Sequence, residues 1–193
     1  NFSRGDNMTY VMSDIHGMYS KYIKMLEKIN FSDDDELFII GDVVDRGDEP
    51  INVLLDMMER PNIFPIMGNH DLCAVRVLSK LAVDITDENS TSHLDMDDMG
   101  VLLNWQLNGG TVTMKQFGML SKEKRADILE YMSEFSMYEV IDADENTFIL
   151  VHAGLGNFRP DKKLKEYTDD ELLYYRTNPD QEYFEDKSVY VVT

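Results

Sequence analysis

Short apolar segments that end in clusters of polar residues recur along the first half of this chain, and this pattern constrains the fold more than any other feature. The segments cover residues 8–13, 37–40 and 63–67, and apolar residues at helical spacing lie between them. Strands that alternate with helices in this way are typical of βαβ units, whose strands are parallel. The pattern therefore predicts an α/β fold.

The middle of the chain lacks this regularity. Residues 83–120 are rich in Asp, Asn, Ser, Thr, Gly and Met without clean periodicity, so we expect a helical or irregular insertion that caps one end of the sheet. The later elements that the pattern predicts are a helix at 121–135, strands at 138–141 and 147–151 joined as a hairpin, a short helix that begins at Thr168, and a strand at 189–192. Residues 1–193 contain no repeat or low-complexity linker, so we expect a single domain.

Charge and cysteine content exclude several classes of protein. The chain has 18 Lys and Arg against 37 Asp and Glu, a formal net charge of −19, whereas binding to nucleic acid or to an anionic membrane needs a basic face. Cys73 is the only cysteine, so an intrachain disulfide and a disulfide-stapled secreted scaffold are excluded. No apolar run approaches the roughly 18–20 residues of a membrane span and no signal peptide is recognised, so we expect a cytoplasmic protein.

The polar residues that follow the apolar segments are of the types that bind metals. They are Asp14, His16, Asp42, Asp45, Asn69 and His70, with His152 after a later strand. Because ligands in α/β folds gather at the carboxyl ends of strands, we expect these side chains to lie together. Taken singly, each cluster also has a structural explanation, such as a turn, a helix N-cap or a buried histidine. Their joint occurrence favours one site for Mn²⁺, Fe²⁺ or Zn²⁺, which accept carboxylate, imidazole and amide ligands.

Three of these clusters resemble the signature motifs of one protein family, the calcineurin-like metallophosphoesterases. The motifs are Asp14-x-His16-Gly17, Gly41-Asp42-Val43-Val44-Asp45-Arg46-Gly47 and Gly68-Asn69-His70-Asp71. The intact Asp-Arg-Gly resembles the phosphoprotein phosphatase branch, and residues 105–110 and 174–176 resemble its bacterial and phage members, typified by lambda protein phosphatase. The resemblance implies a four-layer α/β/β/α sandwich of two mixed sheets, here lacking its last strands.

The resemblance also implies a role for each residue. Two divalent ions, Mn²⁺ with Fe or Zn as alternatives, would be held by Asp14, His16, Asp42, Asn69 and His152, with Asp42 bridging. The other implied roles are proton donation by His70, orientation of that histidine by Asp45, and phosphate binding by Arg46, Arg176 and Asn69. The implied activity is hydrolysis of a phosphomonoester in the manner of a serine/threonine protein phosphatase, on a phosphoprotein or a small phosphate ester.

Departures from the motifs keep two other functions open. The third motif ends in Asp71 where protein phosphatases usually carry Glu, and this ending resembles symmetrical diadenosine-tetraphosphate hydrolases. Those hydrolases, however, typically lack the acid that stands here as Asp45. The family supplies a further metal-binding histidine just after a strand like 189–192, where this chain ends, so a truncated, non-catalytic phosphate-binding module is the third alternative. Residues 1–7 are expected to be a non-native leader.

Three residues outside the motifs carry simpler expectations. His93, the one histidine not yet assigned, is expected on the surface of the insertion. Trp105 is expected to anchor the insertion in the core, and Cys73 to be an apolar residue of a helix.

Overall fold

The computed structural model describes residues 7–82, 95–176 and 182–193, so His93 and part of the insertion lie outside the described residues. The strands are β1 (Thr9–Ser13), β2 (Glu36–Ile40), β3 (Ile63–Ile66), β4 (Glu139–Ala143), β5 (Asn146–Leu150) and β6 (Val189–Val192). The helices are α1 (Tyr19–Ile29), α2 (Pro50–Met58), α3 (Asn69–Ala82), α4 (Met96–Trp105), α5 (Thr111–Gly118), α6 (Lys122–Ser133) and α7 (Asp169–Leu173), with a π-helical turn η1 (Gln106–Gly110) and a 3₁₀ turn η2 (Leu164–Glu166). Within these ranges no helix has the length and apolar character needed to cross a bilayer.

The first sheet is parallel, as the alternation of strands and helices predicts. Its order is β1-β2-β3, and both strand pairs run in the same direction. The central strand β2 is apolar on both faces because both are covered: Leu37 and Ile39 join the core formed with the helices, and Phe38 and Ile40 join the core formed with the second sheet. This two-sided burial explains why β2 reads as a continuous apolar run rather than an alternating one.

The second sheet is mixed and contains the predicted hairpin. Strands β4 and β5 pair antiparallel, and β6 pairs parallel to β5. Asp144 and Glu145 form the turn with φ of 49° and 66°, the left-handed backbone that tight hairpins with a right-handed strand twist require. The structure confirms an α/β fold with two sheets and helices.

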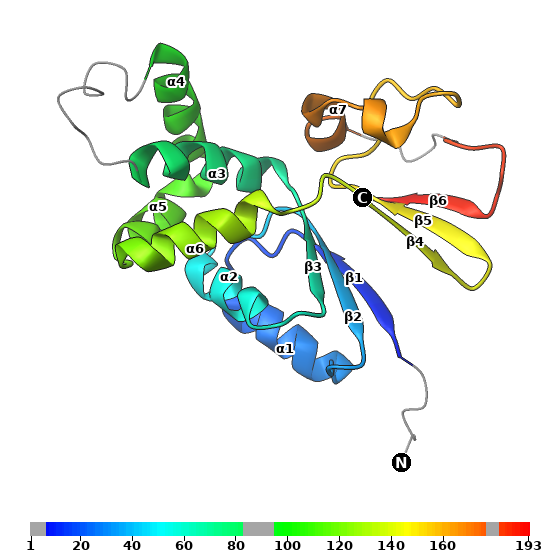
Figure 1. Ribbon diagram of the computed structural model, residues 1–193, viewed down its shortest axis with the longest axis horizontal. Coiled ribbons are helices and arrows are strands. Elements are labelled where there is room, and N and C mark those ends of the chain that lie inside the picture. Colours follow the sequence, from blue (N-terminus) through cyan, green and yellow to red (C-terminus); the bar gives the residue numbers. More distant parts are fainter. Residues whose placement is uncertain (1–6, 83–94, 177–181) are drawn as a thin grey trace.

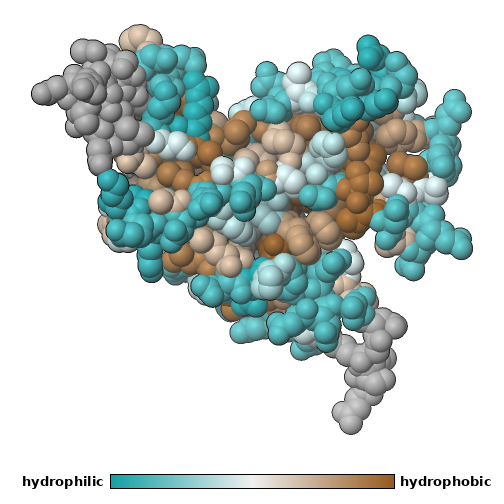
Figure 2. Space-filling model, viewed as in Figure 1, coloured by the Kyte–Doolittle hydropathy of each residue, from teal (hydrophilic) through white to brown (hydrophobic). Residues whose placement is uncertain are grey.

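The sheets and helices stack in four layers. Helices α1 and α2 cover one face of the first sheet, the second sheet covers the other, and α7 lies on the far side of the second sheet (Figure 1). The core between the sheets is small, and its buried residues are Phe38, Ile40, Ile66 and Leu150. Figure 2 shows apolar side chains visible in the region between the sheets and polar side chains over the outer helices.

The described part of the insertion is helical and packs on α3. Helix α4 begins with a capping box in which Asp95 accepts from the backbone N–H of Asp98, and α6 begins at Ser121, whose hydroxyl accepts from Lys124 N. Between α4 and α5 the chain turns at Gly109, which has φ of +110°. The insertion is thereby folded back toward the loops that follow the strands of the first sheet.

Candidate metal centre and active site

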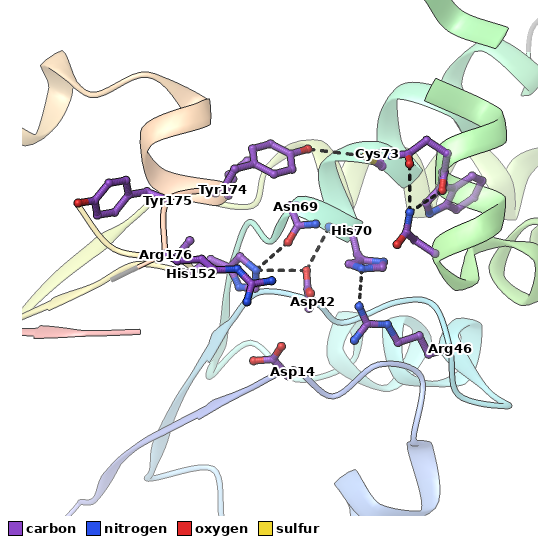
Figure 3. Close-up of a pocket in the computed structure, with 15 residues that line it drawn as sticks. Asp14, Asp42, Arg46, Asn69, His70, Cys73, His152, Tyr174, Tyr175 and Arg176 are labelled. Atoms are coloured by element: carbon purple, nitrogen blue, oxygen red, sulfur yellow. Dashed lines mark hydrogen bonds and ion pairs between the residues drawn. The ribbon is translucent and has the colours of Figure 1, made fainter. Parts of the chain in front are cut away.

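The loops that follow β1, β2, β3 and β5 meet at a cavity of about 460 Å³ at the carboxyl edge of the first sheet. The residues named from the sequence that line this cavity are Asp14, Asp42, Arg46, Asn69, His70, His152 and Arg176. His16 and Asp45 lie just behind the lining and hydrogen-bond to Arg46 and His70. The structure thus brings together every side chain that the sequence marked as a site residue. Figure 3 shows those that line the cavity.

The loops reach this edge by tight turns with unusual backbone geometry. Asp14, Asp42 and Asp45 have φ of 52°, 52° and 73°, a left-handed conformation that Asp tolerates better than most residues. Gly41, with φ of +69°, lies where three loops converge, and a Cβ there would lie 2.6 Å from both Gly68 Cα and the His152 ring. Close approach of the backbones therefore places the carboxylates and imidazoles within a few ångströms of one another.

Asp42 occupies the centre of the site, between two histidines. Its Oδ2 lies 3.4 Å from His16 Nε2 and its Oδ1 lies 3.5 Å from His152 Nε2. The Nδ1 atoms of these rings lie 2.9 Å from the Val44 carbonyl oxygen and 3.2 Å from that of Ile40, so each Nδ1 donates to a carbonyl. Each Nε2 lone pair is therefore turned toward the Asp42 carboxylate, the arrangement that fixes histidines as metal ligands.

The positions of the nitrogen and oxygen atoms of these side chains fit a bound cation. His152 Nε2 faces two oxygens, Asn69 Oδ1 at 3.0 Å and Asp42 Oδ1 at 3.5 Å, and a divalent ion there would satisfy the lone pairs of all three. On the other side of Asp42, Asp14 Oδ1 lies 3.8 Å from His16 Nε2, and its side chain is 54% exposed toward the cavity. Candidate ligands therefore lie on both sides of the Asp42 carboxylate, which suits a site that would hold divalent ions.

A cation of the protein already bridges part of this ligand set. Arg46 donates from Nη1 to His16 Nε2 at 2.8 Å and from Nη2 to His70 Nε2 at 3.0 Å. One potential metal-ligand atom from each of His16, Asp42 and His70 also lies within 4.8 Å of the other two, close enough to surround one metal ion. The guanidinium occupies a position where positive charge is favoured, beside the cavity that would receive a phosphate.

Asp45 and His70 form a buried pair beside the metal ligands. His70 Nδ1 donates to Asp45 Oδ2 at 2.7 Å, and the Asp45 side chain is 0% exposed. Burial opposes protonation of His70, but its hydrogen bond with Asp45 and the charges of Asp42 and Asp45 raise its pKa above the ordinary value. The hydrogen bond with Asp45 holds the ring through Nδ1 and leaves Nε2 toward the cavity, the position from which a histidine can pass a proton to a bound compound.

Two residues of the insertion complete this pair, and the sequence analysis did not assign them there. Trp105 is buried, as expected of a core anchor, but its Nε1 also donates to Asp45 Oδ2 at 2.6 Å. Thr113 Oγ1 donates to Asp45 Oδ1 at 2.6 Å. The only signal in the sequence was the resemblance of residues 105–110 to a family segment, and nothing pointed to Thr113.

Asp71, the departure in the third motif, ties the loops together. Its Oδ1 accepts from the backbone N–H groups of Val43 and Val44, and its Oδ2 accepts from that of Gly68. Burial, followed by the nearby charge of Asp42, raises the pKa of Asp71 to about 7. The short side chain places both oxygens among backbone donors of two motifs, so Asp71 supports the loops rather than lining the cavity.

The wall opposite the metal ligands comes from α7 and α3. Tyr174, which follows α7, is half-exposed, and its hydroxyl lies 3.8 Å from Cys73 Sγ on α3 (Figure 3). Burial raises the pKa of the Cys73 thiol, which fits the expected apolar helix residue. Arg176, which follows Tyr174 and Tyr175, also lines the cavity.

Known proteins share both the sequence pattern and the fold. The chain is 34% identical over 98 residues to the symmetrical bis(5'-nucleosyl)-tetraphosphatase of Wigglesworthia glossinidia brevipalpis, a match over 50% of this chain and 36% of that protein. It is 32% identical over 99 residues to the symmetrical bis(5'-nucleosyl)-tetraphosphatase of Erwinia tasmaniensis, with the same shares. The match thus spans little more than a third of these relatives.

A solved structure of a proposed diadenosine tetraphosphatase has the same fold. It superposes with a TM-score of 0.55 at 19% identity, over 87% of this chain and 63% of the other. The family model of the calcineurin-like phosphoesterases matches residues 9–191, which include all the site residues described above. The chain therefore belongs to the calcineurin-like phosphoesterase family.

Proposed function

We propose that this chain is a hydrolase of small phosphate compounds that uses two divalent ions, with dinucleoside polyphosphates such as diadenosine tetraphosphate as its substrate class. This was the alternative reading of the sequence, and the names of the curated relatives support it over a phosphoprotein substrate. Asp71 at the end of the third motif favours the same class. We expect Mn²⁺ to support activity, with Fe or Zn as alternatives.

One observation carries the hydrolytic role. Asp42 lies between His16 and His152 while Arg46 projects a guanidinium beside the same cavity, so metal ligands and a phosphate-binding cation converge at one place. Arg46 and Arg176 can both bind phosphoryl oxygens in the bidentate manner of a guanidinium. A polyphosphate chain carries several negative charges, which two arginines and two ions would neutralise.

The side chains divide the reaction between them. Bound divalent ions would supply Lewis acidity to the phosphoryl group and to water. Asp14, His16, Asp42, Asn69 and His152 would hold those ions, Asn69 would also contact the phosphate, and Arg46 and Arg176 would orient it. Water supplies the oxygen that attacks phosphorus. His70, which carries a proton on Nε2 once Arg46 contacts the phosphate instead, gives that proton to the leaving oxygen as its bond to phosphorus breaks, while Asp45 holds the ring in place through Nδ1–H.

A second substrate class is favoured by the Asp45–His70 pair itself. Cleavage of an anhydride releases a phosphate oxygen, which is weakly basic and needs little protonation. Cleavage of a serine or threonine phosphomonoester releases a strongly basic alkoxide, which needs a proton donor. A fully buried carboxylate at 2.7 Å from the histidine is the feature expected for the harder leaving group. Phosphomonoesterase activity is therefore the second candidate.

The test is hydrolysis of diadenosine tetraphosphate, a phosphoserine peptide and an aryl phosphate by the purified protein supplied with Mn²⁺. We expect ADP as the product from diadenosine tetraphosphate, at a higher kcat/KM than for the other two compounds. A higher kcat/KM for the phosphopeptide would instead support the second candidate. If the metal-loaded protein hydrolyses none of the three compounds, both candidate functions are contradicted, and a phosphate-binding module without catalysis is supported.

A further inference from the structure

We propose that Trp105 and Thr113 are positioning residues for proton donation, because they hold the buried Asp45 carboxylate in the orientation that directs His70 toward the leaving group. The insertion then contributes to proton transfer, in addition to capping one end of the sheet. The inference rests on the role of His70 as proton donor proposed above. Its effect is expected to grow with the basicity of the leaving group, so the experiment below varies the leaving group.

The hydrogen bonds of Asp45 leave its carboxylate no freedom to turn. Oδ2 accepts from His70 Nδ1 at 2.7 Å and from Trp105 Nε1 at 2.6 Å. Oδ1 accepts from Thr113 Oγ1 at 2.6 Å, and that hydroxyl oxygen in turn accepts from Asp45 N at 3.0 Å. Rotation of the carboxylate would break bonds on both oxygens inside a site with no water contact, where an unpaired buried oxygen is costly.

The turn between α4 and α5 is shaped to deliver these two donors. Gly109 O accepts from Arg46 N at 3.2 Å, and a Cβ on Gly109 would lie 2.8 Å from the Arg46 side chain. A Cβ on Gly110 would overlap the indole ring of Trp105. The two glycines therefore allow the insertion to lie against the second motif, with Trp105 before the turn and Thr113 after it.

The two donors also fix the direction of Asp45. With Trp105 Nε1 on Oδ2 and Thr113 Oγ1 on Oδ1, the carboxylate stays in line with His70 Nδ1. Without them the carboxylate is free to leave His70 Nδ1, and the ring loses the partner that fixes its direction. Packing in the core requires only the apolar ring of the residue at position 105. It does not require the N–H that Trp105 directs at the Asp45 carboxylate.

The reaction step that depends on this arrangement balances as follows. Water forms the new bond to phosphorus and releases a proton to the solvent, and the bond to the leaving oxygen breaks with its electron pair on that oxygen. The proton of His70 Nε2 passes to the leaving oxygen, which departs as a phenol from the aryl phosphates used below, and the neutral His70 takes up a proton from the solvent before the next turnover. A leaving group that is stable as an anion needs no such proton, so the basicity of the leaving group reports on the role of His70.

The activity test therefore uses dinitrophenyl, nitrophenyl and phenyl phosphate, in order of rising leaving-group basicity, with Mn²⁺ present. For Trp105→Phe and for Thr113→Val we expect kcat on phenyl phosphate to fall about tenfold or more, and kcat on dinitrophenyl phosphate to change less than about twofold. Thr113→Ser keeps the hydroxyl and should retain the wild-type pattern. Phe117→Leu, a buried residue of α5 without a bond to Asp45, is the matched control and should change all three rates by the same factor.

A second readout needs no metal and no turnover. The His70 Nδ1–H proton should give a downfield NMR resonance that is lost in Asp45→Asn. In Trp105→Phe and Thr113→Val we expect it to exchange with water about tenfold faster, and to be unchanged in Phe117→Leu. An equal fall of kcat for every leaving group, or an unaltered resonance in both variants, would overturn the proposal. If the wild type hydrolyses no phosphate compound, the proposed function fails and the resonance alone decides the positioning role.

Discussion

The two sheets contribute unequally to the site. The parallel sheet supplies Asp14, His16, Asp42, Asp45 and Asn69 from the ends of three adjacent strands, and its β2 is covered on both faces. The second sheet supplies His152 and meets the first through a small core. Four of the five proposed metal ligands are thus positioned by the large core, whereas His152 alone depends on how the second sheet docks.

This difference teaches where the two proposed ions should differ. Asp14, His16 and Asp42, the proposed ligands of one ion, all come from one edge of the first sheet. Asn69 and His152, the proposed ligands of the other, come from different sheets, so their relative position depends on the contact between the sheets. We expect the first ion to bind more tightly, and loss of the inter-sheet contact to affect the second ion alone.

The largest effect should come from removing the side chain that both ions share. Asp42→Asn is expected to lower kcat/KM about 10³-fold or more, since several kcal/mol of charge stabilisation is lost with the metals. Isothermal titration with Mn²⁺ should show both binding events weakened. Asp161→Asn, an exposed change of the same kind, is the control. Activity in Asp42→Asn that also survives a chelator would contradict the two-metal mechanism.

The next effect compares the two cores directly. Leu54 lies in the large core beside the first sheet and Leu150 in the small core between the sheets, and both are 0% exposed. We expect Leu54→Ala to lower the free energy of unfolding by about 3–5 kcal/mol, and Leu150→Ala by about 2–3 kcal/mol because its partly exposed surroundings can collapse further. Urea unfolding monitored by circular dichroism measures both values. A larger loss for Leu150→Ala would mean that the second sheet is the better anchored.

A smaller effect should separate the ions. His152→Ala removes a ligand of only one of them, so we expect the affinity for that ion to fall about 100-fold while the other still binds. Competition titration with a Mn²⁺ indicator, run beside Asp42→Asn, gives the number of ions retained. Loss of both ions in His152→Ala would show that the sheets do not act separately.

The smallest effect concerns the loop and helix on the outer face of the second sheet. Hydrogen bonds from Lys162, then from Thr168 N and Asn157, lower the pKa of Glu171 to about 2. Because this pKa is below the usual value of about 4.5, the charged form stabilises the fold above that pH, and the contribution is lost as pH falls toward 2. Urea midpoints of the wild type and Glu171→Gln should differ most at pH 6, differ less at pH 3 and converge as the pH approaches 2. A constant difference across this range would show that the carboxylate charge is not what stabilises the loop.

Features that depend on residues close together in the sequence could be predicted, and features that depend on distant residues could not. The strands and the residues at their ends were predictable because the apolar segments and the following polar clusters are local patterns, as at Ile40 followed by Gly41 and Asp42. The hairpin and the helix that begins at Thr168 were predictable for the same reason, since turns and caps act within a few residues.

The contacts of the insertion could not be predicted in the same way. Trp105 and Asp45 are 60 positions apart, and Thr113 and Asp45 are 68 apart. No local pattern marks a buried indole as a donor to a distant carboxylate, because that depends on how α4 and α5 dock on the loops. The role of Asp71 could not be predicted for a similar reason. Its partners are the backbone N–H groups of Val43 and Val44, and every residue except proline has such a group, so the sequence does not single them out.

The left-handed backbone at the strand ends has a consequence for how this protein can be stabilised. Asp14, His16, Asp42, Asp45 and Arg46 all have positive φ, which costs about 1 kcal/mol or more per residue. Glycine at any of these positions would relieve that cost and also remove a functional side chain. Selection for thermal stability alone would therefore favour glycine at these positions. The stabilised variants would lose the side chains of the site, so gains in stability here are expected to come with loss of activity.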